Sequence, residues 1–146
     1  MTIKYILSVI FLSIFLLSCS TDPVAIDYHT DQCADCKMMI SDSRFGAELV
    51  TKKGKIFKYD AIECMIRAYI SQGESEFAHV MVTDFNSPST LINAKESTYL
   101  VSTSRPSPMG GNLSGYYESS SIDKTLLHSE SVILDWDGLV QHYEMK

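Results

Sequence analysis

The sequence predicts an α+β fold, in which a strand-strand-helix-strand unit occurs twice and the two units pack as one small domain. Two short strand-like runs, 47–51 and 55–59, precede a segment with helical apolar spacing, and another strand-like run follows at 77–85. A looser copy of the same order follows in the second half of the chain. With 146 residues, the chain is long enough for one domain with a modest core, which we expect over residues 32–146.

The first unit begins with a hairpin, because Lys52-Lys53-Gly54 joins its two strands with glycine at the turn. Asp60 then stands where an N-cap belongs, and Glu63 follows three residues later as in a capping box. An amphipathic helix is expected from there to Gly73, since apolar residues recur at spacings of three and four: Ile62, Met65, Ile66, Tyr69 and Ile70.

The second unit is predicted from weaker patterns after a linking segment at 86–94. Its expected elements are strands at 98–103, 115–118 and 131–134 and a helix at 121–129. Asp135 is placed to cap a last short helix through Trp136 and Tyr143. We expect the two units to share one sheet that is covered by helices.

The first 18 residues have the features of a secretory signal, with Lys4 followed by a nearly unbroken apolar run too short for an ordinary transmembrane helix. Leu16-Leu17-Ser18-Cys19 resembles the lipobox of bacterial lipoproteins, so Cys19 is expected to carry lipid and anchor the chain to a membrane. An ordinary signal peptide with a chance cysteine is the alternative. Residues 19–31 then form the lipidated cysteine and a polar linker, and the domain faces the periplasm in the bacterial cell envelope.

The charge of the chain argues against a nucleic-acid partner. The formal net charge is −6, and removal of the predicted signal takes away only Lys4, which leaves −7. Proteins that bind nucleic acid or anionic lipid surfaces through charge are normally basic.

The segment Cys33-Ala34-Asp35-Cys36-Lys37-Met38-Met39 gathers two thiols and two thioethers. Soft sulfur donors select Cu(I), with Zn(II) as an alternative, over oxygen-binding cations. A disulfide, a thiol-redox pair or simple core packing would also fit these residues. Once Cys19 is assigned to lipid, Cys33, Cys36 and Cys64 remain, and this odd number favours an unpaired thiol or a ligand set.

A second candidate segment is 104–112, where two prolines and two glycines present Met109 on a shaped loop. Met109 is therefore either a ligand or a residue packed within the loop. Cys64 lies in the first turn of the predicted helix, where the helix dipole favours a thiolate, but it is equally compatible with the core.

Other soft or nitrogen donors are less specific. Met38 is a candidate third donor, whereas Met39 is expected to pack. His79 and His142 could donate nitrogen, although a lone histidine beside apolar residues is more often structural.

Several of these motifs together resemble the NosL family, lipoproteins encoded with nitrous-oxide reductase. They occur in the same order and at similar spacing: Cys33-Ala34-Asp35-Cys36-Lys37-Met38, Phe57-Lys58-Tyr59-Asp60 with Cys64 four residues later, Val82-Thr83-Asp84-Phe85, Ile92-Asn93-Ala94 and Ser107-Pro108-Met109-Gly110. The resemblance runs from about residue 33 to the end of the chain. Lys37 stands where the family usually has glycine, and Tyr59 where an acid is common.

The resemblance implies a membrane-anchored Cu(I) chaperone of denitrification that supplies copper to nitrous-oxide reductase and has no enzymatic activity. Its motif carries over onto Cys33, Cys36, Met38 and Met109. The alternatives are a soft-metal store or sensor of the TRASH or YHS kind, a thiol oxidoreductase, and a structural lipoprotein held by one disulfide. The sequence does not indicate an oligomeric state.

Overall fold

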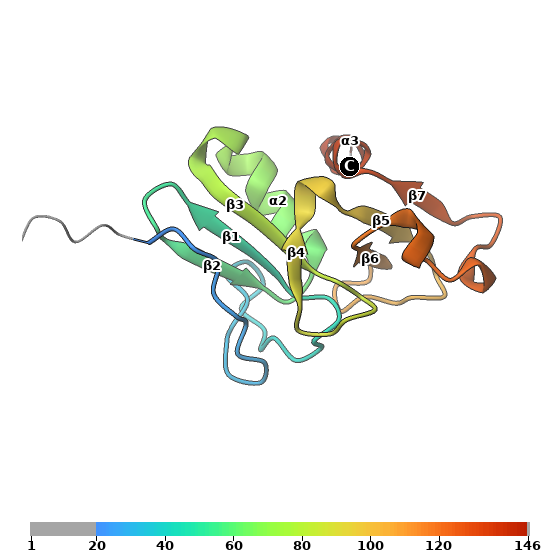
Figure 1. The fold of residues 1–146 in the computed structure, drawn as a ribbon, viewed down its shortest axis with the longest axis horizontal. Helices are drawn as coiled ribbons and strands as arrows, with labels where there is room; N and C mark the ends of the chain where they lie inside the picture. The colour runs from blue at the N-terminus through green and yellow to red at the C-terminus, as the bar shows by residue number, and fades with distance from the viewer. Residues whose placement is uncertain (1–19, 146) are drawn as a thin grey trace, which may run out of the picture.

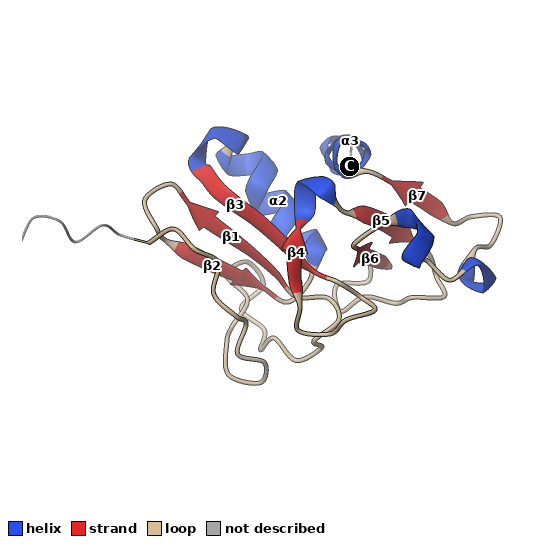
Figure 2. Cartoon of the chain, in the orientation of Figure 1, coloured by secondary structure: helices blue, strands red, loops and turns tan. Residues whose placement is uncertain are grey.

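The computed structural model describes residues 20–145, so the predicted signal peptide and Cys19 lie outside the described residues. The described chain forms two antiparallel sheets that lie one after the other along the long axis of the molecule (Figures 1 and 2). The α+β class with two packed units is confirmed. The expectation that both units share one sheet is wrong, because the units form separate sheets of four and three strands.

The four-stranded sheet has the order β2-β1-β3-β4. Its strands are β1 (Ala47–Thr51), β2 (Ile56–Tyr59), β3 (Phe77–Thr83) and β4 (Leu91–Asn93). The predicted hairpin turn is present, with Gly54 at a φ of 79° and its N–H donating to Thr51 O at 2.9 Å. Strand β4 lies inside the segment predicted as a linker, since a three-residue strand leaves no clear alternation in the sequence.

The chain leaves the first sheet immediately after β4. The side chain of Asn93 accepts a hydrogen bond from Lys95 N and so starts a 3₁₀ turn, Ala94–Glu96. This turn ends the pairing with β3, and the next strand begins a new sheet. The 3₁₀ turn capped by Asn93 therefore lies at the point where the chain passes from one sheet to the other.

Helix α2 (Ile62–Gln72) packs against β1 and β2 and also contacts β6 of the second sheet. It ends as predicted at Gly73, which has a φ of 88° and donates its N–H to Tyr69 O. The predicted N-cap is wrong, because Ala61 is the N-cap residue and no side chain caps the helix. Asp60 lies one residue too early, since β2 ends at Tyr59 and the helix has its N-cap at Ala61. The side chain of Asp60 instead accepts a bond from the backbone of Ser41.

The three-stranded sheet has the order β6-β5-β7. Its strands are β5 (Thr98–Val101), β6 (Leu113–Tyr116) and β7 (Val132–Leu134). The strand expected at 115–118 begins two residues earlier, at Leu113. The helix expected at 121–129 is wrong: two 3₁₀ turns, Ser119–Ser121 and Lys124–Leu126, occupy this region. Asp123 accepts bonds from the backbone and side chain of Thr125, and such local bonds compete with a helix.

Helix α3 (Trp136–Glu144) closes the core. Asp135 caps it as predicted by accepting a bond from Gly138 N at 2.8 Å. The ring of Trp136 packs edge-on against Tyr69 of α2, with centroids 5.0 Å apart, so the two helices share one apolar cluster. Neither α2 nor α3 nor any 3₁₀ turn between residues 20 and 145 is long and apolar enough to cross a membrane.

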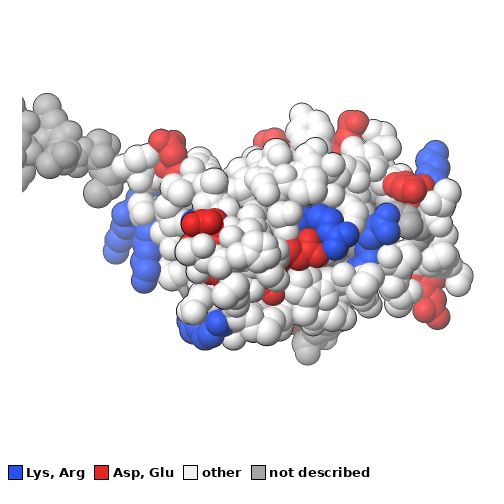
Figure 3. Space-filling view, turned by 90° about the horizontal axis from the view of Figure 1, so that it is seen from below, with Lys and Arg blue, Asp and Glu red and all other residues white. Residues whose placement is uncertain are grey.

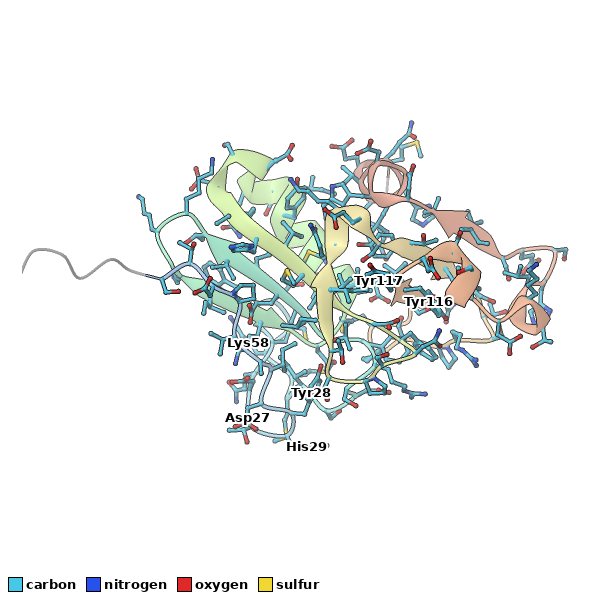
Figure 4. The ribbon with its side chains drawn as sticks, in the orientation of Figure 1. Asp27, Tyr28, His29, Lys58, Tyr116 and Tyr117 are labelled. Carbon is cyan, nitrogen blue, oxygen red and sulfur yellow. The ribbon has the colours of Figure 1, made fainter. Side chains whose placement is uncertain are left out.

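Part of the segment expected to be a free linker packs on the domain. Ile26 is buried, and Tyr28 Oη lies 3.1 Å from Thr83 Oγ1. Lys58 of β2 pairs with Asp31 at 2.6 Å, and Figure 4 shows Lys58 above the loop that carries Asp27, Tyr28 and His29. The sequence of this segment shows no regular polar and apolar pattern, because the segment buries single side chains without forming a strand or a helix.

Candidate metal centre

The three cysteines of the described chain converge on one place. The Sγ atoms of Cys33, Cys36 and Cys64 all lie within 4.8 Å of one another. Cys33 and Cys36 come from the loop before β1, whereas Cys64 comes from the first turn of α2. The structure thus places Cys64 beside the Cys-x-x-Cys pair, a proximity that the sequence left open.

Backbone hydrogen bonds hold the Cys-x-x-Cys loop in shape. Cys33 N donates to Met38 O at 2.8 Å, and Lys37 N donates back to Cys33 O at 3.1 Å. Ala34 N donates to Lys58 O at 2.8 Å, which ties the loop to the free edge of β2. These bonds attach the loop to the edge of the sheet.

The same loop directs N–H groups at its sulfur atoms. Cys33 Sγ accepts bonds from the backbone N–H groups of Asp35, Cys36 and Asp60. Cys36 Sγ accepts one from the N–H of Met38. These donors favour thiolate, which is the form of cysteine that binds metal.

The three thiols share their protons unequally. The thiol of Cys64 donates a hydrogen bond to Cys33 Sγ and, with the backbone donors, lowers the pKa of Cys33 to about 5. The same bond, together with burial, raises the pKa of Cys64. Burial also raises the pKa of Cys36. In the metal-free group, negative charge is therefore favoured on Cys33 and disfavoured on Cys36 and Cys64.

Arg67 joins the two halves of the centre. Its Nη2 atom lies 2.9 Å from Asp35 Oδ2 in the loop and 3.4 Å from Cys64 Sγ on its own helix. The positive charge favours the thiolate of Cys64 and opposes the rise in its pKa. Sequence reasoning missed Arg67, although a cation three residues after a helical cysteine faces the same side of the helix.

Lys37 adopts a conformation that glycine reaches more easily. Its φ is 64°, in the left-handed region that costs a residue with a Cβ about 1 kcal/mol. The Lys37 Nζ atom donates to Ala34 O at 2.6 Å, within the same turn. The loop thus keeps the left-handed turn at this position despite the absence of glycine.

The loop with Met109 returns to the same end of α2. Gly110 N donates to Ser107 O at 2.9 Å, and Gly110 has a φ of 75°, so the predicted turn is present. Met109 is half-buried and packs against the core cluster that contains Cys33 and Cys64. The structure thus places this second loop against the same apolar cluster that contains Cys33 and Cys64.

Glu63 connects that loop to the helix. Its side chain is 2% exposed, and its Oε1 atom accepts bonds from Ser107 Oγ and from Gly111 N, the latter at 3.1 Å. Burial raises the pKa of Glu63. The predicted capping box is therefore wrong, because the carboxylate reaches across to another loop. A charged residue on the buried face of a helix was the sequence signal for this role.

His79 and His142 do not join the three-cysteine group among the described residues, whereas Met38 follows it directly in the same loop. Met38 and Met39 are 45% and 55% exposed, so the expectation that Met39 packs is wrong. These two residues lie in a surface loop, in which Gln32 and Met39 form an isolated antiparallel β-bridge. His79 lies on β3 and His142 on α3, next to the ring of Tyr143.

The donor set fits a soft ion. Three thiolates bound tetrahedrally to one ion at about 2.3 Å lie about 3.8 Å apart, so these sulfurs need to move inward by at most about 1 Å. The face of the molecule seen from below shows acidic and basic side chains scattered among uncharged residues (Figure 3). Among the described residues, that face therefore has no large acidic patch that would attract cations.

Comparisons with known proteins agree with this geometry. The family model for NosL matches residues 23–125. The crystal structure of the copper chaperone NosL from Shewanella denitrificans is similar, with a TM-score of 0.71 and 20% sequence identity over 84% of this chain and 98% of that chain. A search of curated protein sequences found no match. Since the family model covers more than half of the sequence, the chain belongs to the NosL family.

Proposed function

We propose that this protein is a Cu(I) chaperone that binds its cargo through Cys33, Cys36, Cys64 and Met109. The observation that carries the proposal is the convergence of three cysteine sulfurs within 4.8 Å. Thiolate and thioether donors prefer Cu(I), and Zn(II) is the competing ion for such a set. Membership of the NosL family supports copper as the cargo.

Delivery would proceed by exchange of ligands. Cys33 and Cys64 are buried, whereas Cys36 and Met109 are half-buried and lie closer to solvent. A client's donors would therefore replace Cys36 and Met109 first, while the inner cysteines still hold the ion. Because Cys33 is already ionised at neutral pH, returning protons to Cys36 and Cys64 accompanies release.

The client and the anchor belong to the same proposal. The family resemblance supports nitrous-oxide reductase as the client, and the lipobox supports a lipid on Cys19 that holds the domain on the periplasmic side of a membrane. Val24 N already donates to Glu48 of β1. The five residue steps from Cys19 to Val24 span at most about 17 Å, so the anchor would keep the domain close to the lipid surface.

Copper binding is tested by anaerobic Cu(I) titration of residues 20–146 against a chromogenic chelator. We expect one Cu(I) per chain, bound more weakly by Cys33→Ser, Cys36→Ser, Cys64→Ser and Met109→Leu. Met145→Leu is the matched control, because Met145 is 74% exposed at the end of α3. Equal binding by the wild type and every cysteine variant would reject the site.

Delivery is tested by mixing the copper-loaded protein with copper-free nitrous-oxide reductase and measuring copper in each protein after separation. Transfer faster than from a Cu(I)–chelator complex of equal affinity supports a chaperone. Copper that stays on the donor would favour a store or sensor instead. The anchor is tested by replacing Cys19 with alanine and following the protein from the membrane to the soluble fraction.

A further inference from the structure

We propose that Glu63 is a positioning residue that holds the Met109 loop at the first turn of α2, the turn that also carries Cys64. This inference rests on the proposed function, since it concerns how the thioether donor is placed for Cu(I). Glu63 itself is not a ligand in this proposal. Its role is to fix the loop before the ion arrives.

The hydrogen bonds of Glu63 to other residues come from this loop. Ser107 Oγ and Gly111 N, on either side of Met109, both donate to the Oε1 atom. Ser107 Oγ also accepts a bond from Leu113 N, the first residue of β6, at 3.4 Å. A chain of bonds thus runs from β6 through the loop to the first turn of α2, where Cys64 is the next residue.

The cost of burying this carboxyl group indicates that its position has a purpose. A polar group removed from water is unfavourable unless hydrogen bonds compensate for the loss of solvent. Glu63 is almost completely buried, and within the described part of the chain its Oε2 atom has no hydrogen-bond partner. Apart from the N–H of Glu63 itself, the hydrogen bonds that compensate for its burial come from Ser107 and Gly111 of the loop.

The loop is shaped to receive the carboxyl group. A Cβ atom at Gly111 would lie 2.7 Å from Glu63 Oε1 and 2.8 Å from Glu63 Cγ. Glycine at this position therefore lets the loop backbone approach close enough for Gly111 N to donate. The absence of a side chain at Gly111 thus matches the space that the Glu63 carboxyl group occupies.

This arrangement gives Met109 its position at low entropic cost. Hydrogen bonds hold the loop on both sides of Met109, at Ser107 and Gly111, so the position of the thioether is restricted before the ion binds. Preorganised donors bind more tightly because less conformational freedom is lost on binding. Residues that orient metal ligands typically change affinity by about 10–100-fold when they are replaced.

The test is a double-mutant cycle measured by anaerobic Cu(I) competition titration of residues 20–146. Glu63→Ala is expected to weaken Cu(I) binding by about 10-fold. In the Met109→Leu background the same change is expected to have less than about a 2-fold effect, because the loop then carries no donor. Glu63→Gln should keep most of the affinity, since its Oε1 can accept the same two bonds.

A second variant guards against loss of folding in Glu63→Ala. Ser107→Ala removes one donor from the loop, leaves the helix intact and should weaken binding in the Met109 background only. Ser120→Ala is the matched control, because Ser120 makes a comparable bond to Glu118 in an exposed turn. Thermal melts of the metal-free variants report whether the fold is kept.

The outcomes separate this inference from the proposed function. If the wild type binds no Cu(I), the proposed function fails. If the wild type binds Cu(I) but Ser107→Ala and Glu63→Ala lower the affinity equally with Met109 and with Leu at position 109, the positioning role is rejected and copper binding stands. If Met109→Leu itself binds as tightly as the wild type, the positioning role is also rejected.

Discussion

The fit between Glu63 and Gly111 can be broken by one methyl group. Gly111→Ala places a Cβ atom 2.7 Å from Glu63 Oε1 and 3.0 Å from Tyr143 Oη, whereas ordinary contacts lie at 3.4–4 Å. The backbone of Gly111 does not have a positive φ, so the change acts through crowding alone. We therefore expect alanine to push the carboxyl group away from the loop.

The magnitude follows from these distances. Relief of the contact requires a displacement of about 0.7 Å, which would lengthen the 3.1 Å bond from Gly111 N to about 3.8 Å and break it. Crowding of a packed site and loss of a hydrogen bond to a buried carboxyl group together cost about 2–4 kcal/mol. For a domain of this size, that corresponds to a melting temperature about 8–16 °C lower.

Thermal unfolding of the metal-free protein measures this effect directly. The neighbouring Gly110→Ala is the control: its Cβ meets no atom within 4 Å, but its φ of 75° disfavours alanine by about 1 kcal/mol. Adding Glu63→Asp to Gly111→Ala should recover part of the loss, because the shorter side chain leaves room for the methyl group. A Gly111→Ala protein that melts with the wild type would refute the reasoning.

Three further predictions concern the cysteine site. Between about pH 6 and pH 8, the logarithm of the Cu(I) association constant should rise by about two per pH unit, because Cys33, with a pKa of about 5, is already ionised while Cys36 and Cys64 must each lose a proton. Competition titrations at several pH values measure this slope, and a slope near zero would mean that a single thiolate binds. Arg67→Ala should weaken Cu(I) binding by about 10-fold and Arg67→Lys by less, in the same assay, and equal affinity for Arg67→Ala and wild type would contradict the role given to the guanidinium. Lys37→Val should lower the free energy of unfolding in urea by about 1–2 kcal/mol, because a β-branched residue disfavours a positive φ, and Lys37→Gly should be tolerated; a stable valine variant would show that the turn adapts.

The sequence by itself determined the elements whose signals are local. The β1–β2 hairpin follows from Gly54 at its turn, and the end of α2 follows from Gly73. Asp135 caps α3 as its position indicates. These features can be predicted because the hydrogen bonds that define them join residues only a few positions apart.

The candidate site could be predicted in part for the same reason. Cys33 and Cys36 share one loop, and the prolines and glycines around Met109 indicate a shaped turn, so each segment was identified separately. The exposure of Met39 and the two 3₁₀ turns in place of a helix at 121–129 were missed. The exposure of Met39 depends on what packs against it, which residue type alone does not specify. The 3₁₀ turns follow from local bonds of Asp123 to Thr125, which compete with the helix that the apolar spacing favoured.

Only the tertiary structure decided how the separate segments meet. Pairing of β1 with β3, rather than any local pattern, fixes the sheet that carries the Cys-x-x-Cys loop on one edge and α2 on one face. That packing brings Cys64 within 4.8 Å of the other two sulfurs and turns Glu63 from an expected helix cap into the anchor of a loop more than 40 residues away. Contacts across such distances arise because burial of the shared core offsets the entropy of closing long loops, and this balance belongs to the whole chain.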